Sequence, residues 1–459
     1  MGTQAARALT TGLLIALLVA AGTALRLYRL DTLPPRLAAD EYTTALDVFE
    51  ILHGSGPALF GLDWKPMPAL TAHASAALMH ATGPSILGLR LLSIVLSILA
   101  GVLLFIVLRW TCAPAVAWAA ALALLADPWF LNFSRSNWEN GHVAAYWLLF
   151  TWCFFSALRA RRRMVWYGLA GGAALALSCY GYFSGRLLLI AWLLYAPLAA
   201  AASGATRQRV RHVYALIGVT AAILFAPQVP VIVQQWDYFQ QRVRNVSVFS
   251  AAADGEAGSQ GSSSAALIAA QLGVTLRYLT IGAPLGKCHY APSDRPPYHL
   301  ALVPLLLIGL VAGARRWRDG TWWWLLLAVP LIATQGLSID APDLARLVVA
   351  APVFFWFIGF GAQTLLDRLP ERRRGQAGLA LACGSALLAV IEWRYFVGWM
   401  SSPAVAVARG GGVDTNEFAT WQALQYRRMA AGRRPVPVVE WERREVHDAL
   451  LAGDDDAVP

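Results

Sequence analysis

Long apolar runs recur from one end of this chain to the other, and they restrict its fold more than any other feature. Each run is about 16 to 22 residues long, the length of an α-helix that crosses the hydrocarbon core of a bilayer. Backbone amides in lipid must form hydrogen bonds within their own segment, which excludes an open β-sheet. Only 14% of the residues are charged, against roughly 25% in soluble proteins. The sequence therefore predicts an all-α polytopic membrane protein.

The apolar runs define eleven predicted transmembrane helices. They cover residues 8–28, 86–108, 113–127, 142–158, 165–181, 187–203, 213–231, 299–314, 321–337, 344–364 and 376–396. The first run is longer than the usual apolar core of a signal peptide, so we interpret it as retained, although "VAAGTA" could imitate a cleavage site.

In such a protein, positive charge determines which loops stay in the cytoplasm, and this explains the net charge of +10. Arginine clusters occur in alternate loops, and short loops rich in arginine stay in the cytoplasm. The clusters are at residues 159–163, 207–211, 315–318 and 371–374. All four become cytoplasmic if the N-terminus is inside, and the C-terminus is then extracytoplasmic. No basic stripe is interleaved with stacking aromatic residues, so nucleic-acid binding is not expected.

Lysine is scarce, because Lys65 and Lys287 are the only two lysines among 37 basic residues. This bias favours a bacterial origin and hence the inner (plasma) membrane. The five cysteines form no CxxC pair, so neither a disulfide framework nor a zinc site is expected.

The predicted topology places three larger segments outside, at residues 29–85, 232–298 and 397–459. We interpret residues 1–396 as one membrane domain and the tail as a segment without a core of its own. Residues 40–53 read as an amphipathic helix that would lie on the membrane surface. The small polar stretch at 251–264 is predicted to be mobile.

Two acids and two cations stand out near this first outer loop. Asp40 and Glu41 begin the predicted helix, Lys65 follows it, and Arg90 opens the second span. Each has a purely structural interpretation, since acids favour a helix N-terminus and cations anchor to lipid headgroups. Taken together they suit a lipid-phosphate substrate, with a carboxylate to accept a proton and cations to neutralise a phosphate.

At these residues the sequence resembles the GT-C membrane glycosyltransferases, in the branch of protein O-mannosyltransferases and aminoarabinose transferases. The ordered features are "LP" before the "DE" pair, "ILHGSGPALF", the "KP" of Lys65 and Pro66, "GPSILGLRLLSIV" and "FSRSNWENGHVAAYWLLF". The resemblance covers roughly residues 20–365 and is strongest in the first 170. It implies a GT-C helical bundle that transfers a sugar from a polyprenyl-phosphate donor to an acceptor hydroxyl with inversion.

The resemblance also implies residue roles. Asp40 matches the catalytic acid and Glu41 its neighbour in the motif. Lys65 matches a lysine near the lipid phosphate, and Arg90 matches an arginine required in O-mannosyltransferases. We expect Lys65, Arg90 and Arg346 to stabilise charge on the donor phosphate. A second acid of the family has its counterpart in Glu139, where aminoarabinose transferases have an aspartate followed by proline.

Four later residues are weaker candidates, each with a plain alternative. His289 is a candidate for approaching a metal or phosphate, or is an ordinary loop histidine. Arg346 is a candidate for contacting the donor phosphate, and the alternative is that its side chain only extends to the membrane–water interface. Arg242 and Arg244 hold an anionic group or form a solvated face.

The sequence-based hypothesis is an extracytoplasmic glycosyltransferase whose acceptor is a protein, a lipid or a glycan. A magnesium, manganese or calcium ion is a possible cofactor, with Asp40, Glu139 and His289 as ligands. The competing hypotheses are a flippase or transporter for lipid-linked sugars, which would use polar sites near the middle of the bilayer, and an inactive membrane scaffold of the same fold.

Overall fold

The computed structural model describes residues 2–61, 67–160, 162–249, 264–282, 288–316, 320–410 and 413–436. These residues are almost entirely helical, with one short antiparallel pair of strands in which Phe60 faces Pro68. The helices of the first half are α1 (Gly2–Leu27), α2 (Ala39–His53), α3 (Leu70–Thr82), α4 (Ile86–Leu108), α5 (Pro114–Ala126), α6 (Pro128–Ser134), α7 (Glu139–Arg159), α8 (Met164–Tyr180), α9 (Leu187–Ser203) and α10 (Arg207–Phe225), and the strands are β1 (Phe60–Gly61) and β2 (Met67–Pro68). The later helices are α11 (Val229–Gln234), α12 (Trp236–Val246), α14 (Ser264–Ile281), α15 (Val303–Arg315), α16 (Trp322–Gly336), α17 (Leu344–Leu347), α18 (Ala351–Leu366), α19 (Glu371–Met400), α20 (Pro403–Arg409) and α21 (Phe418–Ala430).

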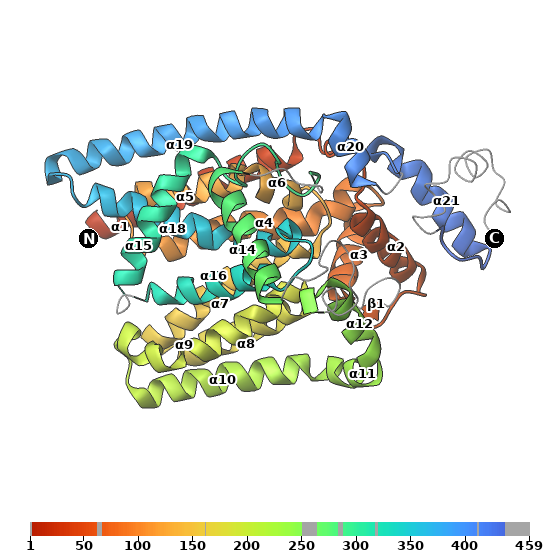
Figure 1. The fold of residues 1–459 in the computed structure, drawn as a ribbon, viewed down its shortest axis with the longest axis horizontal. Helices are drawn as coiled ribbons and strands as arrows, with labels where there is room; N and C mark the ends of the chain where they lie inside the picture. Colours follow the sequence, from red (N-terminus) through yellow and green to blue (C-terminus); the bar gives the residue numbers. More distant parts are fainter. Residues whose placement is uncertain are drawn as a thin grey trace.

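The bundle has two different ends (Figure 1). Helices α10 and α19 run along its length, and α2, α3, α20 and α21 gather at one end, which we call the loop end. The opposite end carries the start of α1 and the connections from α7 to α8, from α9 to α10 and from α18 to α19. We call it the arginine end, because the arginine clusters predicted to be cytoplasmic lie there. The two kinds of loop predicted from charge are thus at opposite ends of the bundle.

The predicted fold class is confirmed, since a helix occupies each of the eleven predicted ranges. The exact number of spans is not established. Within the described residues, eight helices are long and apolar enough to cross a membrane, or nine if the bent pair α5 and α6 counts as one span. Helices α8, α15 and α16 are shorter.

The third predicted span is short because the chain bends sharply at Asp127 and Pro128. Helices α5 and α6 meet at 62°. Pro128 cannot donate a backbone hydrogen bond and occupies the first turn of α6, where none is needed. The Asp127 carboxylate accepts a hydrogen bond from the Phe130 amide at 2.9 Å and so caps the new helix. The bend directs α6 and the turn after it into the loop end.

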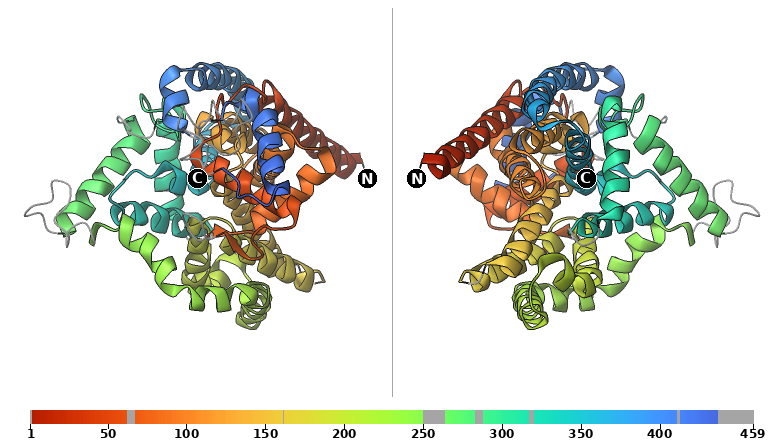
Figure 2. Two further views of the ribbon diagram at one scale, coloured as in Figure 1. Left: turned by 90° about the vertical axis from the view of Figure 1, so that its right-hand side faces the viewer. Right: turned by 90° about the vertical axis from the view of Figure 1, so that its left-hand side faces the viewer.

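The segment at residues 232–298, predicted as an outer loop, contains helices α12 and α14 in the part that the structure describes. Helix α14 is long and apolar enough to be a span by composition. It lies across the bundle, whereas α10 and α19 run along it (Figures 1 and 2). Its Leu272 and Ile268 pack closely on Gly336 at the end of α16. The small polar stretch predicted to be mobile lies, except for Ser264, outside the described residues.

Helix α18 forms the centre of the bundle, and nearly all its side chains are buried. Glycines allow its backbone to approach α15 closely. A Cβ atom at Gly361 would collide with the Leu305 carbonyl, and one at Gly309 would collide with the Phe357 carbonyl. Small residues at such a contact maximise packing between helices in lipid, where the hydrophobic effect contributes little.

Helix α2 spans almost the predicted range and ends at Gly54, whose φ of 85° is a left-handed value that favours glycine. Its apolar face does not lie on lipid as expected. Tyr42, Phe49 and Trp421 belong to one buried cluster that joins α2 and α3 to α21 of the tail. The Trp421 indole nitrogen donates to the Tyr42 hydroxyl at 3.2 Å, and that hydroxyl donates to the Val436 carbonyl at 2.7 Å. The tail therefore covers the first outer loop.

Candidate functional site

The loop end brings together the first turn of α2, the start of α7, the turn between α6 and α7, and α17. Glu41 is the most enclosed acid among them. Its side chain and that of Arg90 are both fully buried, and the Arg90 Nε and Nη2 atoms donate to the two Glu41 oxygens at 2.7 and 3.1 Å. Glu41 also accepts from the backbone amide of Asn137 at 3.0 Å. Buried charges need such partners, because desolvation is costly. This geometry pairs Arg90 with Glu41, whereas the sequence-based hypothesis expects Arg90 to stabilise charge on the donor phosphate.

A second arginine reaches the same carboxylate from the tail. Arg409, at the end of α20, is fully buried, and its Nη2 atom lies 3.4 Å from Glu41 Oε2. It also donates to Asn132 Oδ1 at 3.0 Å, to Ser136 Oγ at 2.9 Å and to the Arg36 carbonyl at 2.7 Å. Burial lowers the pKa of Arg409 to about 10, although the Glu41 carboxylate opposes this shift. The group thus stays cationic at neutral pH.

We call Glu41, Arg90 and Arg409 the buried charge cluster. It joins α2, α4 and α20, which are far apart in the sequence. One carboxylate faces two guanidinium groups, and all three side chains are inaccessible to solvent. The cluster fixes the first turn of α2 against α4 and the tail.

Asp40 precedes Glu41 in this turn and, unlike it, is only partly buried. Thr44 connects the turn to the next acid. The Thr44 hydroxyl lies 3.0 Å from the Asp40 carbonyl oxygen and 3.2 Å from Glu139 Oε1. Glu139 is the first residue of α7, so both acids belong to the first turn of a helix, where the helix dipole favours negative charge. The structure therefore brings the N-termini of α2 and α7 together, as the predicted pairing of Asp40 and Glu139 requires.

Arg346 lies beside the start of α7. The Asn140 side chain donates to the Ala345 carbonyl at 2.8 Å, which places α17 against the residue that follows Glu139. The Arg346 side chain is one-fifth exposed and pairs with Asp343 at 2.9 Å. A cation held in this way keeps its direction and remains accessible to an anion.

Ser338 ties this region to α12. It accepts a hydrogen bond from Arg346 at 3.1 Å and forms an isolated bridge with Ser247, which follows α12. Phe239 of α12 in turn packs on Phe60 of β1, with ring centroids 5.1 Å apart. The first outer loop, α12 and α17 thus form one continuous surface.

The other residues predicted for the site are Lys65, Arg242, Arg244 and His289. Lys65 lies outside the described residues, between β1 and β2, and the Arg242 side chain is also not described. Arg244 is exposed, and its Nη2 atom donates to Gln240 at 2.9 Å. His289 packs its ring on Tyr290, with centroids 4.1 Å apart, and its carbonyl accepts from the Asn132 side chain at 2.8 Å.

Sequence reasoning missed the residues that hold the site together. Arg135 donates to the Leu25, Arg26, Tyr28 and Leu33 carbonyls at 2.7 to 2.8 Å, and so satisfies the otherwise unpaired C-terminus of α1. Its pKa falls to about 9, mainly through burial. Arg135 lies within the motif "FSRSNWENGH", so the sequence contained a pattern from which it could have been identified. No sequence pattern pointed to Arg409, because 368 residues separate it from its partner Glu41.

Among the described residues, no group of three histidine, cysteine, aspartate or glutamate side chains is placed to hold a metal ion. Asp40 and Glu139 belong to helix N-termini that meet at Thr44, and their carboxylates are the hard oxygen donors that divalent cations such as magnesium and calcium prefer.

Comparison with known proteins identifies the architecture. Residues 63–230 match the family model for dolichyl-phosphate-mannose-protein mannosyltransferase. The archaeal oligosaccharyltransferase AglB from Archaeoglobus fulgidus, solved with an inhibitory peptide and a dolichol-phosphate, is similar with a TM-score of 0.57 and 14% identity, over 91% of this chain and 58% of AglB. The protein has the GT-C fold. ArnT from Cupriavidus metallidurans in the apo state is similar to this GT-C protein with a TM-score of 0.50 and 14% identity, over 98% of this chain and 75% of ArnT.

A structure of the Archaeoglobus fulgidus oligosaccharyltransferase with zinc and sulfate gives a TM-score of 0.56 at 14% identity, over 91% of this chain and 55% of the other. This chain thus spans a little over half the length of that enzyme. No curated protein matches the sequence significantly. These likenesses establish the fold.

Proposed function

We propose that this GT-C protein is an inverting glycosyltransferase, which moves a sugar from a polyprenyl-phosphate donor to an acceptor hydroxyl at the loop end. The observation that carries the proposal is the meeting of two helix N-termini. The Thr44 hydroxyl contacts both the Asp40 backbone carbonyl and the Glu139 carboxylate, and α17, which carries Arg346, packs on the residue after Glu139. The AglB structure, which has the same fold, contains an inhibitory peptide and a dolichol-phosphate, which is a lipid phosphate. Two acids near an accessible cation suit a lipid-phosphate donor here.

In the proposed reaction, Asp40 accepts the proton of the acceptor hydroxyl. The acceptor oxygen forms a bond to the anomeric carbon from one face, while the bond from that carbon to the phosphate oxygen breaks on the other. The lipid phosphate leaves with the electron pair, and the configuration inverts. An alcohol is a far weaker acid than a carboxylic acid, so proton transfer is late. Arg346, together with Lys65 as the sequence-based hypothesis has it, stabilises the charge that develops on the phosphate.

The buried charge cluster is proposed to position Asp40 without touching substrate. Asp40 and Glu41 are adjacent in one helical turn, so any displacement of Glu41 also moves Asp40. The contacts of Glu41 with Arg90 and Arg409 oppose that displacement. Small errors in the position of a reacting group are costly in rate, because catalysis requires near-attack geometry.

A divalent cation is proposed at the two acids, as in the sequence-based hypothesis. Asp40 and Glu139 would hold it, and it would supply charge neutralisation for the phosphate. Magnesium, manganese and calcium are the ions that oxygen ligands prefer. The proton transfer to Asp40 and the role of Arg346 do not depend on it.

The proposed reaction is tested directly with purified protein in lipid nanodiscs and radiolabelled polyprenyl-phosphate sugars. We expect one donor to lose its label to an added hydroxyl acceptor. A flippase would move the donor across vesicle membranes with the sugar still attached, and an inactive scaffold would do neither. Either result would refute the proposal.

Arg346→Gln is expected to lower kcat/KM for the donor roughly 100-fold, because one charge-stabilising donor is lost at the transition state. Arg346→Lys should recover part of this loss. The control is Arg277→Gln, an exposed arginine of α14 with no proposed role in the reaction. Initial-rate measurements at several donor concentrations separate the two variants, and equal effects would contradict the assignment of Arg346.

The proposed topology places the loop end outside the cell and the arginine end in the cytoplasm. In a background without the native cysteines, Ser55→Cys should react with a membrane-impermeant maleimide added to intact cells, since Ser55 is exposed beyond α2. Arg163→Cys, exposed before α8, should react only after permeabilisation. The opposite pattern would invalidate the topology and, with it, an extracytoplasmic reaction. The cysteines to be replaced are Cys112, Cys153, Cys179, Cys288 and Cys383.

A further inference from the structure

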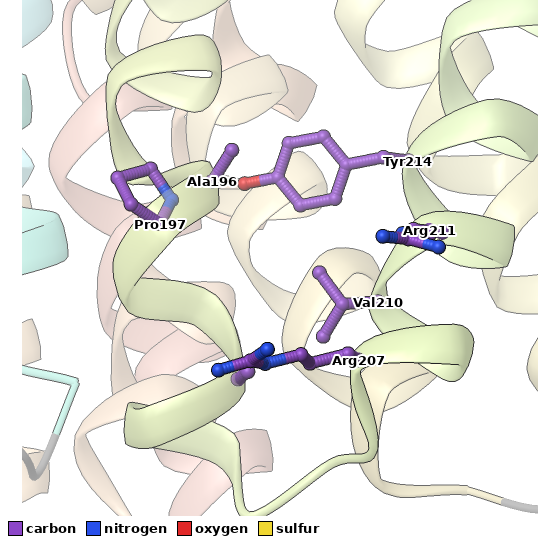
Figure 3. A pocket seen from close by; sticks show the side chains of 7 residues that line it. Ala196, Pro197, Arg207, Val210, Arg211 and Tyr214 are labelled. Atoms are coloured by element: carbon purple, nitrogen blue, oxygen red, sulfur yellow. The ribbon is translucent and has the colours of Figure 1, made fainter.

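A groove between α9 and α10 at the arginine end is not used by the proposed reaction. It encloses about 380 Å³. One wall comes from α9 and the other from α10 (Figure 3). The lining residues are Ala196, Pro197, Ala200, Arg207, Val210, Arg211 and Tyr214.

Residue size explains why the groove exists. The two helices are joined by a short turn at Gly204, whose φ of 65° is left-handed. The lining side chains of α9 are small, so they do not fill the space opposite α10. Tyr214 crosses this space, and its hydroxyl donates to the Trp192 carbonyl at 3.0 Å. The deep part of the groove is therefore apolar and closed by an aromatic ring.

The rim of the groove is cationic. Arg207 and Arg211 lie one helical turn apart on the same face of α10, and both are exposed. The neighbouring Arg209 is different, because it donates to the Ala157 carbonyl at 3.0 Å and so caps α7. No hydrogen bond or ion pair is recorded for the Arg207 and Arg211 side chains with other described residues, and no acid lines the groove. Like charges at this spacing repel, and an anion between them would remove the repulsion.

We infer that this groove is a binding site for an anionic phospholipid of the surrounding membrane. The phosphate lies between Arg207 and Arg211, and an acyl chain follows the apolar wall toward Tyr214. Two features favour a phospholipid over a soluble anion. The cationic rim adjoins an apolar groove between two apolar helices, as a headgroup adjoins its acyl chains, and basic pockets of this kind at the cytoplasmic side bind anionic headgroups. The connection from α9 to α10 is at the arginine end, and α2, whose first turn contains Asp40, is at the loop end (Figure 1), so the inference stands apart from the proposed reaction.

Native mass spectrometry of the purified protein with added lipid tests the inference. We expect phosphatidylglycerol to remain bound and phosphatidylcholine to be lost. The double variant Arg207→Gln/Arg211→Gln should bind phosphatidylglycerol roughly 30-fold more weakly, because each cation near an anionic lipid surface contributes roughly a 5- to 6-fold factor in affinity. The matched control is Arg372→Gln/Arg373→Gln, which removes the same charge from an exposed turn of α19 at the same end.

A second variant tests the apolar part without changing the charge. Ala200→Leu partly fills the groove and should weaken phosphatidylglycerol binding while both arginines remain. Inorganic phosphate at millimolar concentration should not displace the lipid. The inference is overturned if both double variants lose lipid equally, if Ala200→Leu binds as the wild type does, or if inorganic phosphate competes.

Discussion

Asp40→Asn is expected to lower the rate of sugar transfer by roughly 100- to 10,000-fold, the usual contribution of a general base. Asparagine has nearly the same size as aspartate but cannot accept the proton of the acceptor hydroxyl. Asp40 is only partly buried, so the substitution leaves the buried charge cluster in place. The loss should appear in kcat with little change in KM for the donor, because the missing interaction belongs to the transition state.

The measurement is transfer from a radiolabelled donor at equal amounts of protein in nanodiscs. Asp237→Asn is the matched control, since Asp237 is an exposed acid in α12 on the same side of the bundle. Glu139→Gln should have a smaller effect than Asp40→Asn if Asp40 is the base. Near-full transfer by Asp40→Asn would remove the central assignment, whereas loss in all three variants would indicate a general electrostatic effect.

The sequence predicts the helices well and the contacts between distant segments poorly. Apolar runs of bilayer length and loops rich in arginine are local signals, so the eleven helical ranges and the separation of the two ends could be read directly. Helix α14 was missed because it follows a polar stretch and is less apolar than most of the other spans, with a mean hydropathy of 1.3 in its best window. Its orientation across the bundle is a packing property with no local signature.

The candidate site shows the same contrast between local signals, which the sequence contains, and contacts between distant residues, which it does not. Asp40 and Glu139 could be paired from the sequence only through the family resemblance, and the contact through Thr44 is consistent with that pairing. The sequence around Glu41 and Arg90 would be the same whether they contact a substrate or form an ion pair with each other. In the structure both side chains are fully buried and paired, which favours the ion pair. The tail appeared too polar to fold by itself. It packs because α2 and α3 supply the apolar surface that it lacks.

Glu41→Gln is expected to destabilise the fold by about 3 to 5 kcal/mol, the usual cost of removing one partner from a buried ion pair. It leaves two buried guanidinium groups, of Arg90 and Arg409, without a counter-charge. Arg409→Met should cost less, about 1 to 3 kcal/mol, because Glu41 keeps its two hydrogen bonds to Arg90. Thermal unfolding of the purified variants in one detergent, followed by tryptophan fluorescence, gives this order.

Activity separates positioning from stability in the same variants. At a temperature where Arg409→Met is fully folded, its kcat should still fall, because the first turn of α2 loses its contact with the tail while Asp40 itself is unchanged. Arg409→Lys should recover part of kcat, since a lysine can keep one charged contact to Glu41. The control is Arg427→Gln, in α21 but outside the buried charge cluster. If Arg409→Met were less stable but transferred sugar at the wild-type rate, the tail would only hold the fold together, and the link from Glu41 to Asp40 would be wrong.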